Sequence, residues 1–169
     1  MSKEKELRKH CCCITGHRPE KLTLPEFVVS YFLDQKIREA IDDGYTTFIS
    51  GMARGVDIWA ALSVLKYQAK GHPIRLVCAV PYKGFETRWS EEWQEGYRFI
   101  LRFANKVKFI SPRYSPDCFQ IRNEWMVDHA SRLIAVYHGA GGGTQNTLSY
   151  AVLENLSIVF ANPPIEGYL

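Results

Sequence analysis

Short apolar runs alternate with longer amphipathic stretches along most of the chain. The runs are rich in β-branched residues and cysteine, whereas the stretches space their apolar residues three or four apart, as helices do. Strands are expected near Cys11–Thr15, Thr46–Ser50, Ile74–Val80, Lys106–Ile110, Arg132–Tyr137 and Ser157–Phe160, and helices over about Pro25–Asp43, Val56–Lys70, Ser90–Ala104, Phe119–Ser131 and Thr144–Asn155. Strands and helices that alternate in this way predict βαβ units and therefore a parallel sheet.

The predicted architecture is an α/β fold: a Rossmann-like, doubly wound and mainly parallel sheet with helices on both faces, in three αβα layers. Numbered along the chain, the central strands are expected in the order 3-2-1-4-5. A chain of 169 residues is the size of one ordinary domain. We therefore assign residues 11–169 to a single domain and residues 1–10, whose four basic side chains are interrupted by glutamates, to a basic, solvated N-terminal tail.

Two helices carry specific expectations about their buried side chains. The apolar positions chosen for the first helix are Phe27, Tyr31, Ile37 and Ile41, and those for the fourth are Ile121, Trp125, Met126 and Ala130. Asp128 and Arg132 lie four residues apart and are interpreted as an ion pair with each other.

Composition narrows the class of protein. A net charge of +3 is a mild excess that does not by itself indicate nucleic-acid binding. No apolar stretch approaches the ~20 residues of a membrane span, and no apolar run of a signal peptide follows the basic start. The five cysteines lack zinc-site spacing. Alternation along the first strand places Cys11 and Cys13 on one face and Cys12 on the other, as buried reduced thiols, which are typical of the cytoplasm.

Glycines and charged residues concentrate after the predicted strands, at the end where parallel α/β sheets bind ligands. Loops at the other end, such as Asp42-Asp43-Gly44, look like plain helix stops. This asymmetry predicts one functional edge, formed by the five segments Gly16–Lys21, Gly51–Asp57, Pro81–Glu86, Ser111–Cys118 and Gly139–Thr144.

The second of these segments links a strand to a helix through Gly51 and Gly55. Ser50 and Gly51 end the strand, and glycines let the backbone approach a ligand closely. The helix N-terminus that follows favours an anion, to which Arg54 adds a charge-assisted hydrogen bond. The alternative is a tight turn in which Asp57 only stabilises the first helical turn.

The first and last segments extend the predicted phosphate site. Thr15-Gly16-His17-Arg18 follows the central strand but lacks the G-x-G-x-x-G fingerprint. Its His17 is either an acid/base group or a loop hydrogen-bonding group. Gly139–Thr144 contains Gly141, Gly142 and Gly143 in a row, which suits a nest of backbone amides capped by Thr144. A flexible connector is the alternative for this glycine run.

Three further groups bear on the predicted site. Arg122, near the start of the fourth helix, is expected to reach a bound phosphate or ribose. Trp89 and Trp93 are predicted to pack in the core, whereas Tyr82, Phe85 and Trp89 could instead stack a base. No metal site is expected, because the remaining histidines, His10, His72, His129 and His138, lack ligand spacing.

These motifs resemble the SLOG superfamily, which includes the LOG phosphoribohydrolases and the DNA-processing protein A (Smf) family. Ser50-Gly51-Met52-Ala53-Arg54-Gly55-Val56-Asp57 is similar to the SG-x-ARG-[IV]-D motif of the DNA-processing group. The small bacterial YpsA-type proteins also resemble this chain across the stretches Ile14–Pro19, Arg88-Trp89, Arg122-Asn123 and Gly141–Thr144. The resemblance implies a Rossmann-like fold with a phosphate pocket, over nearly all of residues 11–161.

One departure from the LOG pattern bears on the reaction. LOG enzymes use an arginine on one helix, matched here by Arg122, and a glutamate in P-G-G-x-G-T-x-x-E. Thr147 stands at the place of that glutamate, and Asn146 beside it has no charge to stabilise a ribosyl cation. The resemblance therefore implies binding more than catalysis.

We expect the chain to bind or sense a nucleotide or nucleotide-derived phosphate ligand, with no cofactor required. The predicted ligand-binding residues are Thr15, Gly16, His17, Arg18, Ser50, Gly51, Arg54, Gly55, Asp57, Arg122, Gly141, Gly142, Gly143 and Thr144. The first alternative is an N-glycosidic hydrolase of nucleotides, with Arg122, Glu124 and Asp57 as catalytic candidates and Glu20 and Glu86 as further carboxylates. The second is single-stranded DNA binding, which the modest charge does not favour. A homo-oligomer is compatible with the sequence, and no membrane partner is expected.

Overall fold

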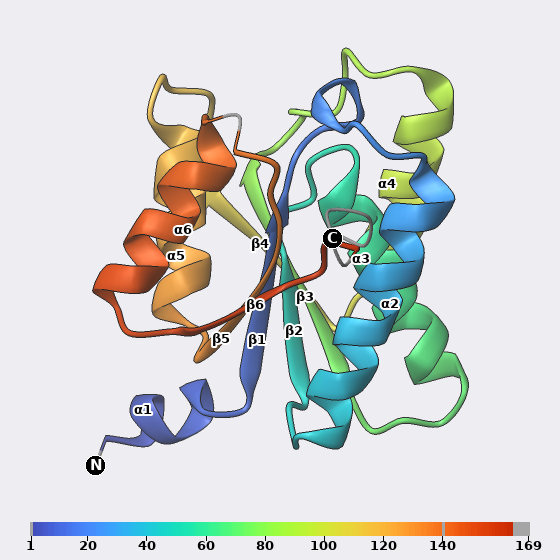
Figure 1. Cartoon of the computed structure of the whole chain (residues 1–169). Helices are drawn as coiled ribbons and strands as arrows, with labels where there is room; N and C mark the ends of the chain where they lie inside the picture. Colours follow the sequence, from blue (N-terminus) through green and yellow to red (C-terminus); the bar gives the residue numbers. More distant parts are fainter. Residues whose placement is uncertain (1, 140, 164–169) are drawn as a thin grey trace.

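The computed structural model describes residues 2–139 and 141–163, and it forms one sheet between two layers of helices (Figure 1). Along the chain the elements are α1 (Lys3–Arg8), β1 (Cys11–Gly16), the 3₁₀ turn η1 (Pro19–Lys21), α2 (Glu26–Asp42), β2 (Thr47–Ser50), α3 (Val56–Ala69), β3 (Arg75–Tyr82), α4 (Glu91–Phe103), β4 (Lys106–Ser111), α5 (Cys118–Asp128), β5 (Arg132–Val136), α6 (Gly143–Leu153) and β6 (Ser157–Phe160).

All the strand pairs are parallel, and the strand order is β4-β3-β2-β1-β5-β6. Helices α2, α3 and α4 cover one face of the sheet, and α5 and α6 cover the other (Figure 1). The predicted α/β class, parallel sheet and three layers are confirmed. The order reverses between β1 and β5, which is where such sheets place their ligand site.

The predicted order 3-2-1-4-5 is wrong at the fourth strand, because β5 and not β4 lies beside β1. The sequences of the two strands explain the difference. Residues of β5 after Arg132 are buried, as a central strand requires, whereas β4 exposes Lys106 and Lys108 and leaves 43% of Phe109 accessible. Lysines on a strand discourage further pairing and are typical of a sheet edge.

The apolar core is divided by the sheet. Cys12 packs with the side chains of α2 and α3, whereas Cys13 packs with those of α5, so the predicted alternation of the cysteines is confirmed. The predicted buried face of α2 is wrong at Phe27 and Tyr31, which are 76% and 59% exposed, whereas Ile37 is buried as predicted and Ile41 packs partly buried against the core. Val29, Leu33 and Ala40 complete the buried face. In α5, Ile121 is likewise 41% exposed, while Met126 is buried as expected.

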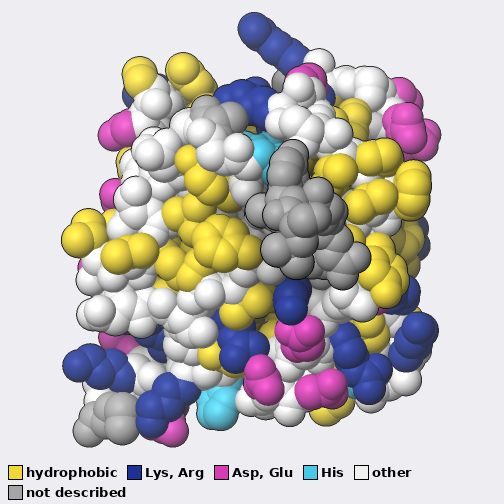
Figure 2. All heavy atoms as spheres, viewed as in Figure 1, with side chains coloured by type: hydrophobic (Ala, Val, Ile, Leu, Met, Phe, Trp, Pro, Cys, Tyr) yellow, Lys and Arg dark blue, Asp and Glu magenta, His cyan; other side chains and the backbone are white. Residues whose placement is uncertain are grey.

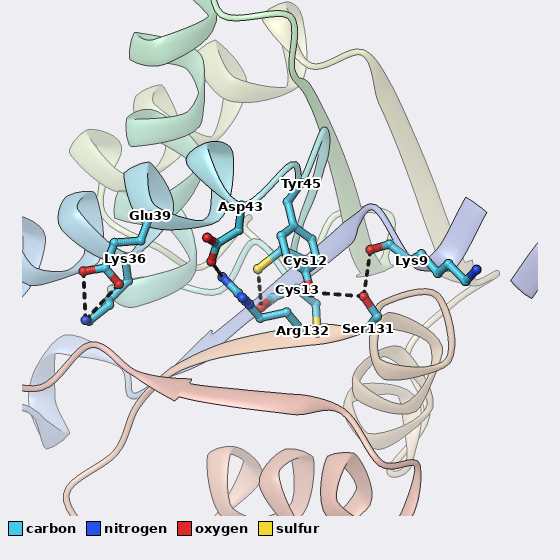
Figure 3. Close-up of polar contacts among 9 residues, drawn as sticks. All are labelled: Lys9, Cys12, Cys13, Lys36, Glu39, Asp43, Tyr45, Ser131 and Arg132. Atoms are coloured by element: carbon cyan, nitrogen blue, oxygen red, sulfur yellow. Dashed lines mark hydrogen bonds and ion pairs between the residues drawn. The ribbon is translucent and has the colours of Figure 1, made fainter. Parts of the chain in front are cut away.

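Within the predicted basic N-terminal tail, Lys3–Arg8 form the helix α1, which has no buried residues. Arg8 Nε donates to the carbonyl of Ala130 at 2.6 Å. Ser131 Oγ donates to the carbonyl of Lys9 at 3.0 Å (Figure 3). These bonds attach the start of the chain to the N-terminal end of β5.

Polar and charged side chains contact one another at the N-terminal edge of the sheet (Figure 3). Arg132 Nη1 donates to Asp43 Oδ2 at 2.8 Å, and the guanidinium lies 4.5 Å from the ring centre of Tyr45. The predicted Asp128–Arg132 pair is therefore wrong, and Asp128 instead accepts a hydrogen bond from Tyr150 Oη at 2.8 Å. Arg132 lies at the start of β5, where its long side chain reaches across the sheet edge to the end of α2.

The face nearest the viewer in Figure 2 carries apolar side chains over α6 and β6. These elements contribute the exposed Val152, Leu153 and Phe160. The expected homo-oligomer stays a prediction, as does the domain boundary at residue 11. No helix in the described part of the chain is both long and apolar enough to cross a membrane.

Candidate functional site

The loop after β2 is folded around Ser50 and Asp57. Ser50 Oγ donates to the carbonyl of Asp57 at 2.8 Å and accepts from the N–H of Met52 at 3.2 Å. The Asp57 carboxylate accepts from the N–H of Ala53 at 3.2 Å through Oδ2. Met52 has a φ of 62°, so the loop turns sharply and needs these bonds to hold its shape. Ser50 therefore stabilises the shape of the loop through these hydrogen bonds.

Gly51 and Gly55 allow three segments to meet. A Cβ on Gly51 would lie 2.9 Å from both Arg122 Nη1 and Asp57 Oδ2. Gly55 has a φ of +89°, and a Cβ there would lie 2.8 Å from the carbonyl oxygen of His17. These two glycines bring the loop after β2 against α5 and against the loop after β1. The tight-turn interpretation accounts for both of them.

Gly16, the last residue of β1, offers a direct test of this packing. A Cβ on Gly16 would lie 2.5 Å from three side-chain atoms of Val56, so Gly16→Ala is expected to lower the free energy of unfolding by about 1–3 kcal/mol. Gly96→Ala is the matched control, since an added Cβ within α4 meets none of the described residues within 4 Å and should stabilise by about 0.5–1 kcal/mol. Urea denaturation of both variants measures the difference, and equal changes would contradict the proposed packing.

Arg122 is fixed on the first turns of α5, with its side chain buried. Its Nε donates to Asn123 Oδ1 at 2.8 Å, and its Nη1 donates to the carbonyl of Gly51. Burial lowers the pKa of the guanidinium, and the neighbouring Asp57 and Cys118 oppose that shift. An arginine remains charged in a protein, so the site contains a permanent buried cation.

Asp57, in the first turn of α3, is 5% exposed. Burial raises the pKa of its carboxyl to about 6, although Arg122 and the N–H of Ala53 act in the opposite direction. Within the described residues its Oδ1 has no hydrogen-bond partner. The carboxyl therefore changes charge near neutral pH, which is a property of groups that act as acids, bases or ligand contacts.

The loop after β1 contributes a neutral imidazole. His17 is 3% exposed, and its Nε2 accepts from the N–H of His138 at 3.3 Å, so the proton lies on Nδ1. Burial lowers the pKa of His17, and His138 and Lys21 lower it further. His17 is therefore neutral at pH 7 and can donate a hydrogen bond through Nδ1.

The 3₁₀ turn η1 directs Lys21 back toward the glycine loop before α6. The Lys21 ammonium would lie 3.4 Å from a Cβ placed on Gly142. In the same turn, Glu20 forms an ion pair with Arg54, and this arginine lowers the pKa of the Glu20 carboxyl. The pair joins the loops after β1 and β2 at the surface.

The glycine loop leads directly into α6. Gly142, with a φ of 84°, is the N-cap of the helix, and it has no side chain to cap with. The prediction that Thr144 caps the helix is wrong, because Thr144 lies within the first turn. Thr147 Oγ1 donates to the carbonyl of Gly143 at 2.9 Å, so the residue at the place of the LOG glutamate is used within the helix. Ala140, in the predicted Gly139–Thr144 segment, lies outside the described residues.

These segments enclose a pocket of ≈ 350 Å³ at the C-terminal edge of the sheet, the upper edge in Figure 1. It lies beside the ends of β1 and β2, at the point where the strand order reverses. Its lining residues are Thr15, Gly16, His17, Arg18, Lys21, Ala53, Arg54, Asp57, Tyr82, Phe85, Trp89, Phe119, Arg122, Asn123, Gly141, Gly143 and Thr144.

Ten of the predicted ligand-binding residues line this pocket: Thr15, Gly16, His17, Arg18, Arg54, Asp57, Arg122, Gly141, Gly143 and Thr144. Ser50, Gly51, Gly55 and Gly142 lie outside its lining and support the loops. The segment Ser111–Cys118 also supplies none of the described lining residues.

Of the four candidate carboxylates, Asp57 is the one that lines the pocket in the described part of the chain. Glu20 pairs with Arg54, and Glu124 accepts from Gln120 Nε2 at 3.1 Å. Glu86 has a buried Oε2 without a hydrogen-bond partner among the described residues, outside the lining. Residues 2–139 and 141–163 contain no group of three His, Cys, Asp or Glu side chains placed to hold a metal.

Seven lining residues are absent from the predicted ligand-binding set: Lys21, Ala53, Tyr82, Phe85, Trp89, Phe119 and Asn123. Three of them, Tyr82, Phe85 and Trp89, are the residues of the base-stacking alternative. Lys21 ends the first predicted segment, and its return to the pocket depends on η1, which the sequence pattern did not reveal. Asn123 and Phe119 flank Arg122 on α5, where helical geometry would place i−3 on the same side as Arg122. Ala53 offers no chemical signal in the sequence.

Solved structures similar to this chain have the same fold at low sequence identity. DNA processing protein A from Helicobacter pylori, described by its single-stranded DNA binding mode, superposes with a TM-score of 0.65 at 16% identity, covering 98% of this chain and 71% of that protein. The corresponding protein of Streptococcus pneumoniae also gives 0.65, at 13% identity over 95% of this chain. This chain spans about half (53%) of the length of the S. pneumoniae structure.

Similar sequences come from Bacillus. A UPF0398 protein of Bacillus cereus is 29% identical over 132 residues, covering 73% of this chain and 72% of the relative. The uncharacterized SPbeta prophage-derived protein YoqJ of Bacillus subtilis is 33% identical over 117 residues, covering 62% of this chain and 68% of the relative. The family model YpsA, described as the YspA SLOG family, matches residues 12–156. The chain therefore belongs to the YpsA family of SLOG proteins.

Proposed function

We propose that the pocket binds a nucleotide-derived ligand through its phosphate. The observation that carries this proposal is the convergence of cations and glycine-loop backbone on one small cavity: Arg18, Lys21, Arg54 and Arg122 line it together with Gly141 and Gly143. Guanidinium groups and backbone amides at a helix N-terminus are the usual donors to phosphate oxygens. The α6 N-terminus and the left-handed Gly142 beside it suit an anion at this place.

The size of the cavity favours a mononucleotide. Ligand pockets usually span ~300–1,000 Å³, and ≈ 350 Å³ is at the lower end of that range. A dinucleotide or a stretch of DNA would need a longer groove. Single-stranded DNA binding is described for the H. pylori protein, and for this chain it would rest on fold similarity alone.

Mass spectrometry of ligands retained through purification, followed by thermal shift, tests the proposal. The thermal-shift set is AMP, GMP, CMP, ribose 5-phosphate, inorganic phosphate and a single-stranded oligonucleotide. At one hundred times its Kd, a ligand stabilises by about 2.7 kcal/mol, which is roughly 5–10 °C in Tm for a chain of this length. A shift with nucleotides supports the proposal. No shift with any phosphate compound, or a shift with the oligonucleotide alone, would overturn it.

Hydrolysis of the N-glycosidic bond of the same ligand is the second candidate, favoured by Asp57. A buried carboxyl with a pKa of about 6, beside Arg122, has the character of a general acid or base. Water would add at C1′ while the bond to the base breaks and the base leaves with a proton. Chromatography of nucleoside monophosphates incubated with the protein detects the released base, and release that persists in Asp57→Asn would exclude this role for Asp57.

A further inference from the structure

One wall of the pocket is aromatic. Tyr82 at the end of β3, Phe85 and Trp89 in the loop before α4, and Phe119 in the first turn of α5 line it together. Their rings meet edge to face: centroids are 5.9 Å apart for Tyr82–Phe85, 4.9 Å for Phe85–Trp89 and 6.3 Å for Tyr82–Phe119. Two segments, the end of β3 with the loop that follows it and the start of α5, therefore contribute to one continuous aromatic surface.

Core packing accounts for part of this wall. Phe85 and Trp89 also contact Tyr97 of α4, which is 3% exposed and belongs to the core. It does not account for Phe119, which is 41% exposed while its backbone lies in a regular helix. A large apolar side chain left half exposed at the edge of a concave pocket costs hydration free energy unless a ligand or partner covers it.

Helix α5 contributes both to the aromatic wall and to the phosphate-binding groups. Phe119 and Arg122 lie three residues apart on α5, about 4.5 Å along the helix axis, and both line the pocket. A ligand that satisfies both must carry an anionic group near Arg122 and a flat apolar surface near Phe119. A base joined to a phosphate through a sugar has this division of chemistry, whereas a sugar phosphate lacks the flat surface.

We propose that Tyr82, Phe85, Trp89 and Phe119 form a base-stacking subsite, so that the pocket selects intact nucleotides over sugar phosphates and inorganic phosphate. This inference rests on the proposed phosphate site. Every base has a π-face, and stacking on an aromatic side chain strengthens binding by about 5- to 150-fold per base. Phe119 is the specificity-determining member of the wall, because it has the most accessible ring of the four.

Calorimetric titration of the whole chain with AMP and with ribose 5-phosphate tests the subsite. The wild type should bind AMP at least about fivefold more tightly than ribose 5-phosphate. Phe119→Ala should bring the two affinities to within about twofold and leave the Kd for ribose 5-phosphate unchanged. Ile121→Ala is the matched control, since Ile121 lies on the same helix, is also 41% exposed and lies outside the pocket lining. It should keep the wild-type ratio.

A second readout uses Trp89. Its fluorescence should be quenched by AMP and unaffected by ribose 5-phosphate, and Trp89→Phe should remove that signal while Trp59, Trp93 and Trp125 remain. Equal affinity of the wild type for AMP and ribose 5-phosphate, or an unchanged ratio in Phe119→Ala, would overturn the base subsite and leave the phosphate site standing. No binding of any phosphate compound would overturn both.

Discussion

Arg122→Met is expected to lower the free energy of unfolding by about 3–5 kcal/mol and to abolish phosphate binding. The substitution leaves the carbonyl of Gly51 without its guanidinium donor and leaves the buried Asp57 carboxyl without its neighbouring positive charge. Whole-domain stability is usually about 5–15 kcal/mol, so a loss of this size is measurable by urea denaturation and could unfold the chain.

Arg122→Lys keeps the prediction testable if the methionine variant does not fold. Lysine retains the charge but lacks the planar fork that bonds Gly51 and Asn123 at once. This variant should fold, and its affinity for ribose 5-phosphate should fall at least about tenfold.

Arg132→Met is the control for the loss of an arginine. It removes the Asp43 ion pair at the opposite edge of the sheet, so it should leave ligand affinity unchanged. Wild-type affinity in Arg122→Lys, or a stability loss in Arg122→Met no larger than in Arg132→Met, would contradict the role given to Arg122.

The fold class could be predicted from the sequence because alternating strands and helices leave few arrangements that bury both faces of a parallel sheet. The place of β4 was missed because strand order depends on which partner each strand finds. The exposed Lys106 and Lys108 held the information that this strand is an edge. On α2, Phe27 with Tyr31 and Val29 with Leu33 both repeat with helical spacing, so the periodicity alone did not identify which pair is buried.

The sequence predicted the position of the site better than the role of each residue in it. Five segments followed strand ends, and four of these contribute to the pocket, because parallel strands bring their C-terminal loops to one edge. The roles of individual residues were harder to predict. Ser50 and Gly51, for example, shape a loop through contacts with Asp57 and with Arg122, which is distant in the sequence. The aromatic side of the pocket depends on Phe119, whose exposure no periodicity indicates.

Asp57→Asn is expected to stabilise the protein relative to the wild type by an amount that rises by about 3 kcal/mol between pH 4 and pH 7. The carboxyl has a pKa of about 6 in the folded state and 3.8 ordinarily, so between these values the folded state binds a proton that the unfolded state has lost. Wild-type stability therefore falls as pH rises through this window, and the contribution is constant above it. Asparagine has no charge to bury, so the variant lacks this loss.

Asp34→Asn is a control with the opposite sign. Burial raises the pKa of Asp34, but hydrogen bonds from Lys66, Tyr67 and Ser63 outweigh it and bring the pKa below its ordinary value. Asp34 thus contributes stability above pH 3.8 that is lost as pH falls through the lower folded-state pKa. Its asparagine variant should therefore be destabilised at pH 7 and approach the wild type in acid.

Urea denaturation of the wild type, Asp57→Asn and Asp34→Asn from pH 3 to pH 8 measures how the stability of each variant changes with pH. Taking differences from the wild type cancels other titrating groups, including His17. If the difference in unfolding free energy between Asp57→Asn and the wild type does not change with pH, the carboxyl is not desolvated in the folded protein. That result would contradict a role for Asp57 as an acid or base near neutral pH.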